Sequence, residues 1–386
     1  REEMQLIRTF SYRIKDSVAM KHLCRTAGCV NFVWNYINAT SHRAISERHQ
    51  WLSAPDLDKL LTGTSKLIPE LHSQTIQAIT KEYVTSRKQH RKAKLRWRSA
   101  KRKTLGWIPF KASGVRLADD TITYRGISYR FWKSRDWPQD AKLVTGSFNQ
   151  DSRGRWYVNL QFKWEVKPPK PEGEQKLGID LGLKTLVTCS DGTRYERENL
   201  TRQSEEKLAL AQRANKKKQV KALHAKVKNK RKDWNHKVST DLVKRCELIR
   251  VGNVSSGGLK KTKMAKSVSD AGWFQLKTML KNKALMQGVD FGETNEAYST
   301  VTCSVCLKRT GPRGLLGLGV REWECSGCGA KHDRDVNGAR NILVFGLVGQ
   351  PDAGCVPTSR VLLNSGACGS KKGQQGLFPL GRERPV

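Results

Sequence analysis

The fold of this chain is decided by one stretch, which reads Cys303-Ser304-Val305-Cys306, then eighteen further residues, then Cys325-Ser326-Gly327-Cys328, and soon afterwards His332-Asp333-Arg334-Asp335-Val336-Asn337. Two cysteines separated by two residues can both face one Zn²⁺, and a second such pair completes a tetrahedron. Four thiolates leave no open position for a substrate. We therefore predict a structural zinc ion bound by Cys303, Cys306, Cys325 and Cys328.

Carboxylates from distant parts of the chain accompany the predicted zinc site. Asp180 lies where a buried-type strand meets a glycine turn, in Gly178-Ile179-Asp180-Leu181-Gly182, and Asp335 falls on the first turn of a helix predicted from about 335 to 345. Hydrolysis of a phosphodiester by two Mg²⁺ needs carboxylates from separate elements, with the ions about 4 Å apart. The pair indicates a split, metal-dependent nuclease core. Taken singly, Asp180 also fits a turn cap, and Asp333 and Asp335 fit stabilisation of a helix N-terminus.

The charge of the chain points to a polyanionic partner. It has 386 residues, enough for two or more cores, and its 72 Lys and Arg against 35 Asp and Glu give a formal charge of +37. Such a balance favours nucleic acid over a membrane, and no apolar run is long enough to span a bilayer. The six cysteines outside the zinc pattern show no disulfide rhythm, which indicates a reducing cytoplasm. Arg1 stands where Met is expected and no signal peptide follows, so we expect a few leading residues to be absent.

The first half of the chain alternates between strand and helix patterns. Residues 5–14 and 105–167 read as β, whereas two helical stretches cover about 17–46 and 73–95. We therefore expect a β-module formed by residues 1–16 and 96–168, interrupted by a helical insert at 17–95. Residues 169–174 follow as a linker that begins in a proline-rich run.

The second half has short buried-type strands separated by helices. Strands are predicted at 177–180, 185–190, 248–254 and 289–294. Residues 201–247 are predicted as one long helix or a helical hairpin, and residues 267–287 as a helix. The expected α/β domain covers 175–299 and 331–346, with the zinc segment inserted at 300–330. Residues 347–386 are rich in Gly, Pro and Ser and are expected to be disordered. The fold class is therefore α+β with several domains.

Two strongly basic tracts are candidates for contacts with phosphate. Residues 87–103 contain ten Lys and Arg, and residues 202–237 contain thirteen against three acidic residues. A solvated helix face is normally more balanced, so neutralisation of nucleic-acid phosphates is favoured. Aromatic residues that either stack on bases or pack in the core are Trp34, Tyr36, Trp97, Trp107, Trp132, Trp156 and Trp164.

Four segments carry a family resemblance. Gly178–Gly182, Ala265–Trp273, Ser299–Cys306 and Asp333–Leu343 resemble the TnpB (OrfB) family, whose members are transposon-encoded, RNA-guided DNA endonucleases similar to type V CRISPR effectors. The resemblance is clear over about 175–345 and weaker over 1–170, and it does not cover 346–386. It implies a prokaryotic, nucleoid-associated protein that cleaves target DNA beside a short flanking motif.

The resemblance also implies how the parts are used. The β-module would be a β-barrel-like wedge domain, residues 17–95 a recognition insert, and the α/β domain an RNase H-like (RuvC) nuclease with two Mg²⁺. The zinc ribbon at 300–330 would bind the target nucleic acid. The implied partners are a guide RNA derived from the transposon end and double-stranded target DNA, with one protein per RNA and sequence choice made by base pairing.

One acidic residue of the family pattern is missing from its usual place. The second carboxylate normally follows the strand at 248–251, where this chain has Gly252-Asn253. Neighbouring parallel strands end at one sheet edge, about 4.8 Å apart, so a glutamate after the next strand reaches the same ions. We favour Glu296 over Glu293 because it lies nearer the strand's end; a third candidate, Glu247, precedes its strand and points the wrong way.

The predicted catalytic and magnesium-binding residues are therefore Asp180, Glu296 and Asp335. Two alternatives remain at this point: a nuclease-inactive RNA-guided DNA-binding protein or repressor, and a transposition accessory protein that binds DNA through the zinc ribbon without RNA. The presence of both Asp180 and Asp335 favours an active nuclease, because an inactive site has no reason to keep them.

Overall fold

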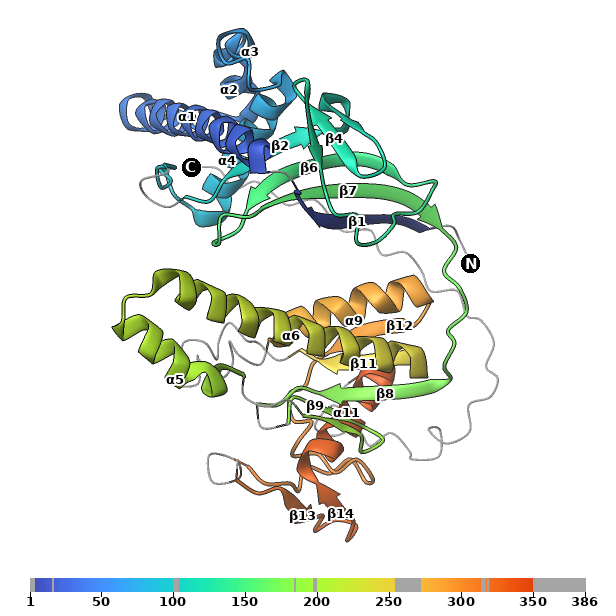
Figure 1. Ribbon diagram of the computed structural model, residues 1–386. Coiled ribbons are helices and arrows are strands. Elements are labelled where there is room, and N and C mark those ends of the chain that lie inside the picture. The colour runs from blue at the N-terminus through green and yellow to red at the C-terminus, as the bar shows by residue number, and fades with distance from the viewer. Residues whose placement is uncertain are drawn as a thin grey trace, which may run out of the picture. The chain divides into compact units, whose positions relative to one another are not determined.

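The structure is a computed structural model, and it describes residues 4–15, 17–99, 104–183, 185–196, 200–253, 272–313, 317 and 319–349 (Figure 1). The predicted tail at 347–386 lies outside these residues from 350 onward, as does the motif Ala265–Trp273 up to 271. Contacts divide the chain into two compact units, Arg1–Pro169 with Leu200–Lys230, and Lys170–Asn199 with Arg231–Val386. The prediction of a mixed α and β protein with several parts is confirmed.

The first unit is built on a four-stranded antiparallel sheet in the order β1-β7-β6-β2. Its strands are β1 (Met4–Arg13), β2 (Trp107–Lys111), β6 (Lys142–Gln150) and β7 (Trp156–Val166). Side chains alternate between the faces of a strand, and on β7 every second residue is buried from Trp156 to Trp164. A hairpin joins β6 to β7, with Gly154 in its turn at a φ of 83°.

A smaller antiparallel sheet follows β2 in the chain. Its strands are β3 (Val115–Leu117), β4 (Thr121–Tyr124) and β5 (Ile127–Arg130), after the short 3₁₀ helix η1 (Ala112–Gly114). Arg125 and Gly126 connect β4 to β5 with φ angles of 52° and 80°, and two left-handed residues are what a type I′ hairpin turn requires. A bridge between Ile14 and Phe131 ties the end of β1 to the residue after β5.

Four helices lie between β1 and β2 in the chain. They are α1 (Ser17–Arg48), α2 (Ala54–Leu60), α3 (Thr64–Leu67) and α4 (Ser73–His90). α1 and α4 pack through aromatic rings, with the centroids of Trp34 and Tyr83 5.4 Å apart. The helix predicted over 73–95 ends earlier, at His90, because Arg91 adopts a left-handed φ of 50° and its N–H closes the last turn.

The basic stretch predicted as one long helix or a helical hairpin forms two helices, α5 (Leu200–Arg213) and α6 (Lys217–Arg245). The break falls at Asn215, whose φ of 51° is a left-handed conformation that asparagine tolerates better than most residues. Within the described ranges, no helix has the length and apolar character needed to cross a membrane.

The second unit contains a five-stranded sheet in the order β10-β9-β8-β11-β12. Its strands are β8 (Gln175–Asp180), β9 (Val187–Cys189), β10 (Arg194–Tyr195), β11 (Cys246–Gly252) and β12 (Asp290–Thr294). β8, β11 and β12 run parallel, whereas β9 is antiparallel to both β8 and β10. The three parallel strands therefore end at one edge of the sheet, where Asp180 and Gly252 lie.

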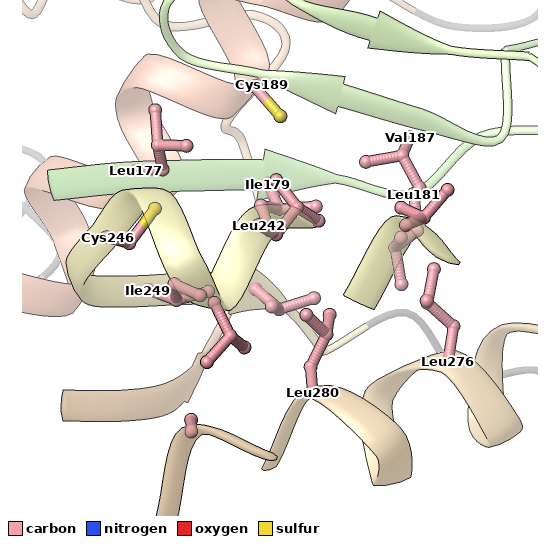
Figure 2. Close-up of a cluster of buried hydrophobic side chains, with 14 of the residues drawn as sticks. Leu177, Ile179, Leu181, Val187, Cys189, Leu242, Cys246, Ile249, Leu276 and Leu280 are labelled. Atoms are coloured by element: carbon pink, nitrogen blue, oxygen red, sulfur yellow. The ribbon is translucent and has the colours of Figure 1, made fainter. Parts of the chain in front are cut away.

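One face of this sheet carries the hydrophobic core of the second unit (Figure 2). Ile179 of β8 and Ile249 of β11 point to this face and are fully buried. They are covered by Leu242 from α6 and by Leu280 from α9 (Trp273–Gln287). Because side chains alternate along a strand, the residues directly before and after Ile179 and Ile249 point to the opposite face of the sheet.

The opposite face is covered by α11 (Arg334–Val348), which contacts β8, β11 and β12 (Figure 1). Gly178 permits the close approach, because a Cβ at this position would lie 2.0 Å from the backbone oxygen of Ala339. By alternation, Asp180 and Gly252 point to the same face as Gly178. The strand ends and the start of α11 thus converge on one place.

The predicted zinc segment leads directly into α11. Strand β13 (Glu322–Glu324) pairs antiparallel with β14 (Lys331–Asp333), and Asp333 is at once the last residue of β14 and the N-cap of α11. The rings of Trp323 and His332 lie 4.6 Å apart on this hairpin. No linker therefore separates the zinc segment from the helix that carries Asp335.

The packing of α11 against β8 predicts opposite effects for two Gly→Ala changes. Gly178→Ala places a Cβ against backbone and should destabilise the protein by about 1–3 kcal/mol. Gly28→Ala is the control, because nothing lies within 4 Å of its Cβ on the exposed face of α1, and it should stabilise by about 1 kcal/mol through helix propensity. Thermal and urea unfolding measure both effects; a neutral Gly178→Ala would contradict the packing described here.

Candidate functional site

The four cysteines of the predicted zinc site come together in the second unit. Their sulfur atoms all lie within 4.8 Å of one another. The two Cys-x-x-Cys turns have matching backbone bonds: Leu307 N–H donates to Cys303 O and Gly329 N–H to Cys325 O, each at 2.8 Å. This repeated turn directs both thiols of each pair toward a common point, as a tetrahedral metal requires.

The surroundings of these sulfurs fit a metal-bound thiolate. Cys325 Sγ lies 3.0 Å from the Thr310 hydroxyl and accepts the Gly327 N–H at 3.3 Å. Burial raises the pKa of Cys325, but these hydrogen bonds, with those from Cys306 and Cys303, outweigh it and lower the pKa to about 6. Burial raises the pKa of Cys303 to about 12, so Cys325 is the sulfur whose surroundings favour a thiolate before a metal binds. The thiolate is the form that binds zinc, so the donor set and its hydrogen bonds both suit a structural zinc ion.

The three predicted carboxylates lie on the α11 side of the sheet; below they are called the carboxylate cluster (Asp180, Glu296 and Asp335). Asp180 ends β8, and its Oδ2 would be 3.3 Å from a Cβ at Gly338 of α11, so a glycine there leaves room for it. Asp335 lies on the first turn of α11. Glu296 follows β12 by two residues, and its N–H points to Asn253 Oδ1 at 3.4 Å.

The glutamate occupies the space of a missing side chain on the neighbouring strand. A Cβ at Gly252 would lie 2.4 Å from Glu296 Oε2 and 3.4 Å from Glu296 Cβ. Gly252 ends β11, the position at which the family pattern places its second acid. The carboxylate of Glu296 therefore fills the space into which a side chain from residue 252 would extend.

The other two glutamates considered from the sequence lie elsewhere. Glu293 on β12 is exposed, and its Oε2 accepts a bond from Lys277 Nζ of α9 at 2.8 Å, on the face opposite to α11. Glu247, near the start of β11, pairs with Lys176 at 3.4 Å, far along the strand from Gly252. The alternation of β12 thus supports Glu296 over Glu293.

The carboxylates influence one another electrostatically. Burial raises the pKa of Asp180 to about 7, and the negative charges of Glu296 and Asp335 add to this effect. Burial also raises the pKa of Glu296, while the positive charge of Lys277 opposes it. Like charges that share a poorly solvated place raise one another's pKa, and a bound cation reverses that cost.

Two arginines pair with the acidic residues at the start of α11. Arg321 Nη1 lies 3.2 Å from both oxygens of Asp335, and Arg194 Nη2 lies 2.6 Å from Asp333 Oδ2. Asp333 also accepts the N–H groups of Asp335 and Val336, so it caps the helix. Burial raises the pKa of Asp333, but these two hydrogen bonds, together with the one from Arg194, lower it overall. Nothing in the sequence distinguished Arg321 from other basic residues of the zinc segment.

The spacing of the two candidate metal sites differs. In the part of the chain that the structure describes, the four cysteines alone form a group of three or more ligand residues with all ligand atoms within 4.8 Å of one another. The carboxylates are therefore more widely spread than the thiols.

The basic tract at 87–103 is only partly a free surface. Arg87 is 3% exposed and donates to Leu52 O at 2.7 Å, so the prediction that it neutralises phosphate is wrong. The guanidinium of Arg98 lies 5.5 Å from the ring centroids of both Trp34 and Trp107, two rings that also contact each other. Residues 100–103 lie outside the described residues. The exposed basic side chains of the tract are Lys88, Arg91, Lys92, Lys94 and Arg96.

Asparagines of α1 hold this exposed segment in place. Asn38 accepts the Leu95 N–H at 3.0 Å and donates to Leu95 O at 2.8 Å, and Asn35 does the same with Arg98 at 2.8 and 2.7 Å. Lys92, Lys94 and Arg96 therefore project from a fixed backbone. The second tract, on α5 and α6, is exposed along most of its length, as the prediction of a phosphate contact requires.

The aromatic candidates divide into packing and exposed residues. Trp34, Trp156 and Trp164 are buried and serve the core of the first unit. Tyr36 and Trp132 are 47% and 46% exposed. Only the exposed rings are available for stacking on bases.

Comparisons with known proteins define the class. The OrfB_IS605 family model, described as a probable transposase, matches residues 159–263, and that of the Cas12f1-like TNB domain matches residues 273–342. A solved structure of Cas12f1 with sgRNA and target DNA superposes with a TM-score of 0.54 at 11% identity, over 88% of this chain and 99% of that chain. At this low identity, the similarity to the Cas12f1 structure is a similarity of fold.

Sequence relatives specify the family. A protein of Streptomyces pristinaespiralis that carries the name RNA-guided DNA endonuclease is 31% identical over 373 residues, which cover 89% of this chain and 90% of the relative. InsQ of Escherichia coli, with the same name, is 31% identical over 245 residues, covering 56% of this chain and 60% of InsQ. The chain belongs to the TnpB family of RNA-guided DNA endonucleases.

The paired zinc turns predict a stability difference at two matching positions. Leu307 and Gly329 both have left-handed backbones, with φ angles of 61° and 72°, and only the glycine adopts this conformation without steric cost. Leu307→Gly should stabilise the zinc-loaded protein by about 1 kcal/mol, and Gly329→Leu should destabilise it by a similar amount. Denaturant unfolding with zinc present measures both; effects of the same sign would contradict the matched turns.

The raised pKa of Asp180 predicts a pH-dependent effect of Asp180→Asn without added divalent cations. In the folded protein the pKa of the Asp180 carboxyl is about 7, against an ordinary value of 3.8. The folded state thus binds more protons between these values, and this stabilising contribution is lost as the pH rises toward 7. The unfolding free energy of the variant minus that of the wild type should therefore rise by about 2 kcal/mol between about pH 5.5 and about pH 8. A difference that does not change with pH would refute the assignment.

Proposed function

We propose that this chain is an RNA-guided DNA endonuclease that depends on divalent metal, with Asp180, Glu296 and Asp335 as the ligands of two Mg²⁺ and a structural zinc on Cys303, Cys306, Cys325 and Cys328. The observation that carries the proposal is the carboxylate of Glu296 in the space beside Gly252. It supplies a third acid to a site that would otherwise have two.

The proposed domains keep the boundaries that the sequence predicts, whereas contacts group Leu200–Lys230 with the first unit. The sheet order β10-β9-β8-β11-β12, with acids at its carboxyl edge and on α11, supports an RNase H-like (RuvC) nuclease formed by 175–299 and 331–346. Residues 300–330 form the zinc ribbon. In the first unit, residues 1–16 and 96–168 form the wedge domain, residues 17–95 the recognition insert, and 169–174 the linker.

The chemistry that Mg²⁺ supplies when bound is activation of a water and stabilisation of charge on the phosphate. The chain's own residues prepare for it. Asp180 and Glu296 present oxygens from the ends of β8 and β12, the two strands that flank β11, and Asp333 caps the first turn of α11, on which Asp335 lies. Arg321 reaches the same place from the zinc ribbon and holds the Asp335 carboxylate by both oxygens.

The partners follow from charge and family. A formal charge of +37, with exposed basic residues on both tracts, suits a guide RNA from the transposon end and double-stranded target DNA. Base pairing would select the target, and the first unit would read shape and the flanking motif. One protein per RNA is the expected assembly.

An active nuclease is favoured over the inactive RNA-guided binder. Burial, with a smaller contribution from the charges of Glu296 and Asp335, raises the pKa of Asp180 to about 7, so ionising this acid without a cation is unfavourable. A protein that only binds DNA gains nothing from keeping three acids in such a place.

The glutamate assignment is tested by exchanging the acid between strands. Glu296→Gln should lower cleavage of guide-matched DNA on the order of a thousand-fold while target binding persists. Gly252→Ala should also lower cleavage with little loss of stability, because its Cβ would meet the ends of two side chains that can shift, Glu296 Oε2 at 2.4 Å and Ile342 Cδ1 at 3.2 Å. The double variant Gly252→Glu with Glu296→Gly should recover part of the activity.

The control is Glu293→Gln, on the other face of the sheet, which should cleave like the wild type. Full activity of Glu296→Gln would refute the assignment. Tight guided binding by the wild type, without scission at any Mg²⁺ concentration, would instead establish the inactive binder.

A further inference from the structure

We propose that the zinc centre and the carboxylate cluster are coupled, so that zinc on the four cysteines strengthens divalent-cation binding by Glu296 and Asp335. Asn337, Asn341 and His332 are the positioning residues that carry this coupling. The inference rests on the proposed function for the role of the carboxylates. It assigns the zinc ribbon a part in building the catalytic centre itself.

The first link consists of hydrogen bonds from Asn337 of α11 to the backbone on both sides of the zinc ligand Cys303. Asn337 Oδ1 accepts the N–H of Ser304 at 2.9 Å, and its Nδ2 donates to Thr302 O at 2.7 Å. These two backbone groups lie on either side of Cys303. Because Asn337 is two residues after Asp335 on the same helix, the zinc ligand and the acid are held to one rigid element.

The second link consists of hydrogen bonds from Asn341 of α11 to the turn that follows Glu296. Ser299 N–H donates to Glu296 O at 3.0 Å, which closes the turn. Asn341, one helical turn beyond Asn337, donates through Nδ2 to Ser299 O at 2.7 Å and Thr302 O at 2.6 Å. The same helix that carries Asp335 therefore also fixes the segment between Glu296 and Cys303.

The third link is a contact with the zinc ligand itself. His332 Nε2 lies 3.0 Å from Cys303 Sγ, and His332 is 4% exposed. It precedes Asp335 by three residues, so residues on both sides of this acid contact the Cys303 region. A partner that bonds to a metal ligand orients it and changes its affinity for the metal.

Burial makes these links stiff. Asn337 and Asn341 are 1% and 0% exposed, and Ser299 and Thr302 are also buried. If these hydrogen bonds broke without admitting water, the buried carbonyl oxygens of Ser299 and Thr302 would lose their donors, which is energetically unfavourable. A shift of Cys303 on loss of zinc is therefore transmitted to α11 and to the Glu296 turn.

The chain connections reinforce the links. Glu296 precedes Cys303 by seven residues, and Asp335 follows Cys328 by seven residues, so each acid is joined to a zinc ligand by a short segment. On one side this segment is the bonded turn, and on the other it is β14 and the N-cap of α11. Both routes end at the zinc centre.

Coupling between two binding sites is reciprocal, so Mg²⁺ must strengthen zinc binding by the same factor. The experiment measures the zinc affinity of the full chain by equilibrium competition with a chelating dye, with and without saturating Mg²⁺. In the wild type, Mg²⁺ should raise the zinc affinity about tenfold. Asp335→Asn, which lacks a cation ligand, should show no such gain.

In Asn337→Ala and in Asn341→Ala, the ratio of the zinc affinities with and without Mg²⁺ should fall toward one. His332→Gln removes the contact with Cys303 and should lower the same ratio. The matched control is Asn235→Ala, a buried asparagine of the same unit that bonds Gln275 and touches neither metal site. It should lower stability but keep the full factor.

Calorimetric titration of Mg²⁺ separates the two ways of failing. If the wild type binds Mg²⁺ but its zinc affinity does not change, the coupling is refuted and the proposed function stands. If the wild type binds no Mg²⁺, both are refuted.

Discussion

The carboxylate cluster depends on the lack of a side chain at Gly252. A Cβ there would lie 2.4 Å from Glu296 Oε2, so the residue at the end of β11 must be small for the glutamate after β12 to reach the α11 face. The position of an acid in the sequence and its position in space are thus separable. What the chemistry requires is an oxygen at one point, and either of two adjacent parallel strands can deliver it because both end at the same edge.

The rest of the second unit holds that point in place. Gly178 lets α11 approach β8, which brings Asp335 over the sheet edge, and Asp333 caps the helix at its first turn. The zinc segment joins the same helix through β14 and through the buried amides of Asn337 and Asn341. The zinc segment and the sheet therefore both pack against α11, and Asp335 of the carboxylate cluster lies on the same helix.

Much of this was predictable from sequence because the decisive patterns are local. The two Cys-x-x-Cys turns predict their own geometry, and Asp180 at the end of a buried-type strand predicts its place at a sheet edge. Glu296 required a choice over Glu293, which the alternation of β12 supports. Arg321 was not predictable because nothing distinguishes it from the other basic residues of the zinc segment. The bonds of Asn337 and Asn341 were not predictable because their partners lie 33 to 42 residues away in the chain. Arg87 was misassigned, since a basic run does not reveal that one member turns inward to Leu52 O.

The most direct measurement is a crystal structure of the protein with guide RNA, uncleavable target DNA and Mn²⁺, in which anomalous scattering locates the ions. The account predicts two manganese sites about 4 Å apart, between Asp180 and Asp335, with an oxygen of Glu296 bound to at least one of them. Ions held without Glu296, or held by Glu293 on the other face of the sheet, would contradict it.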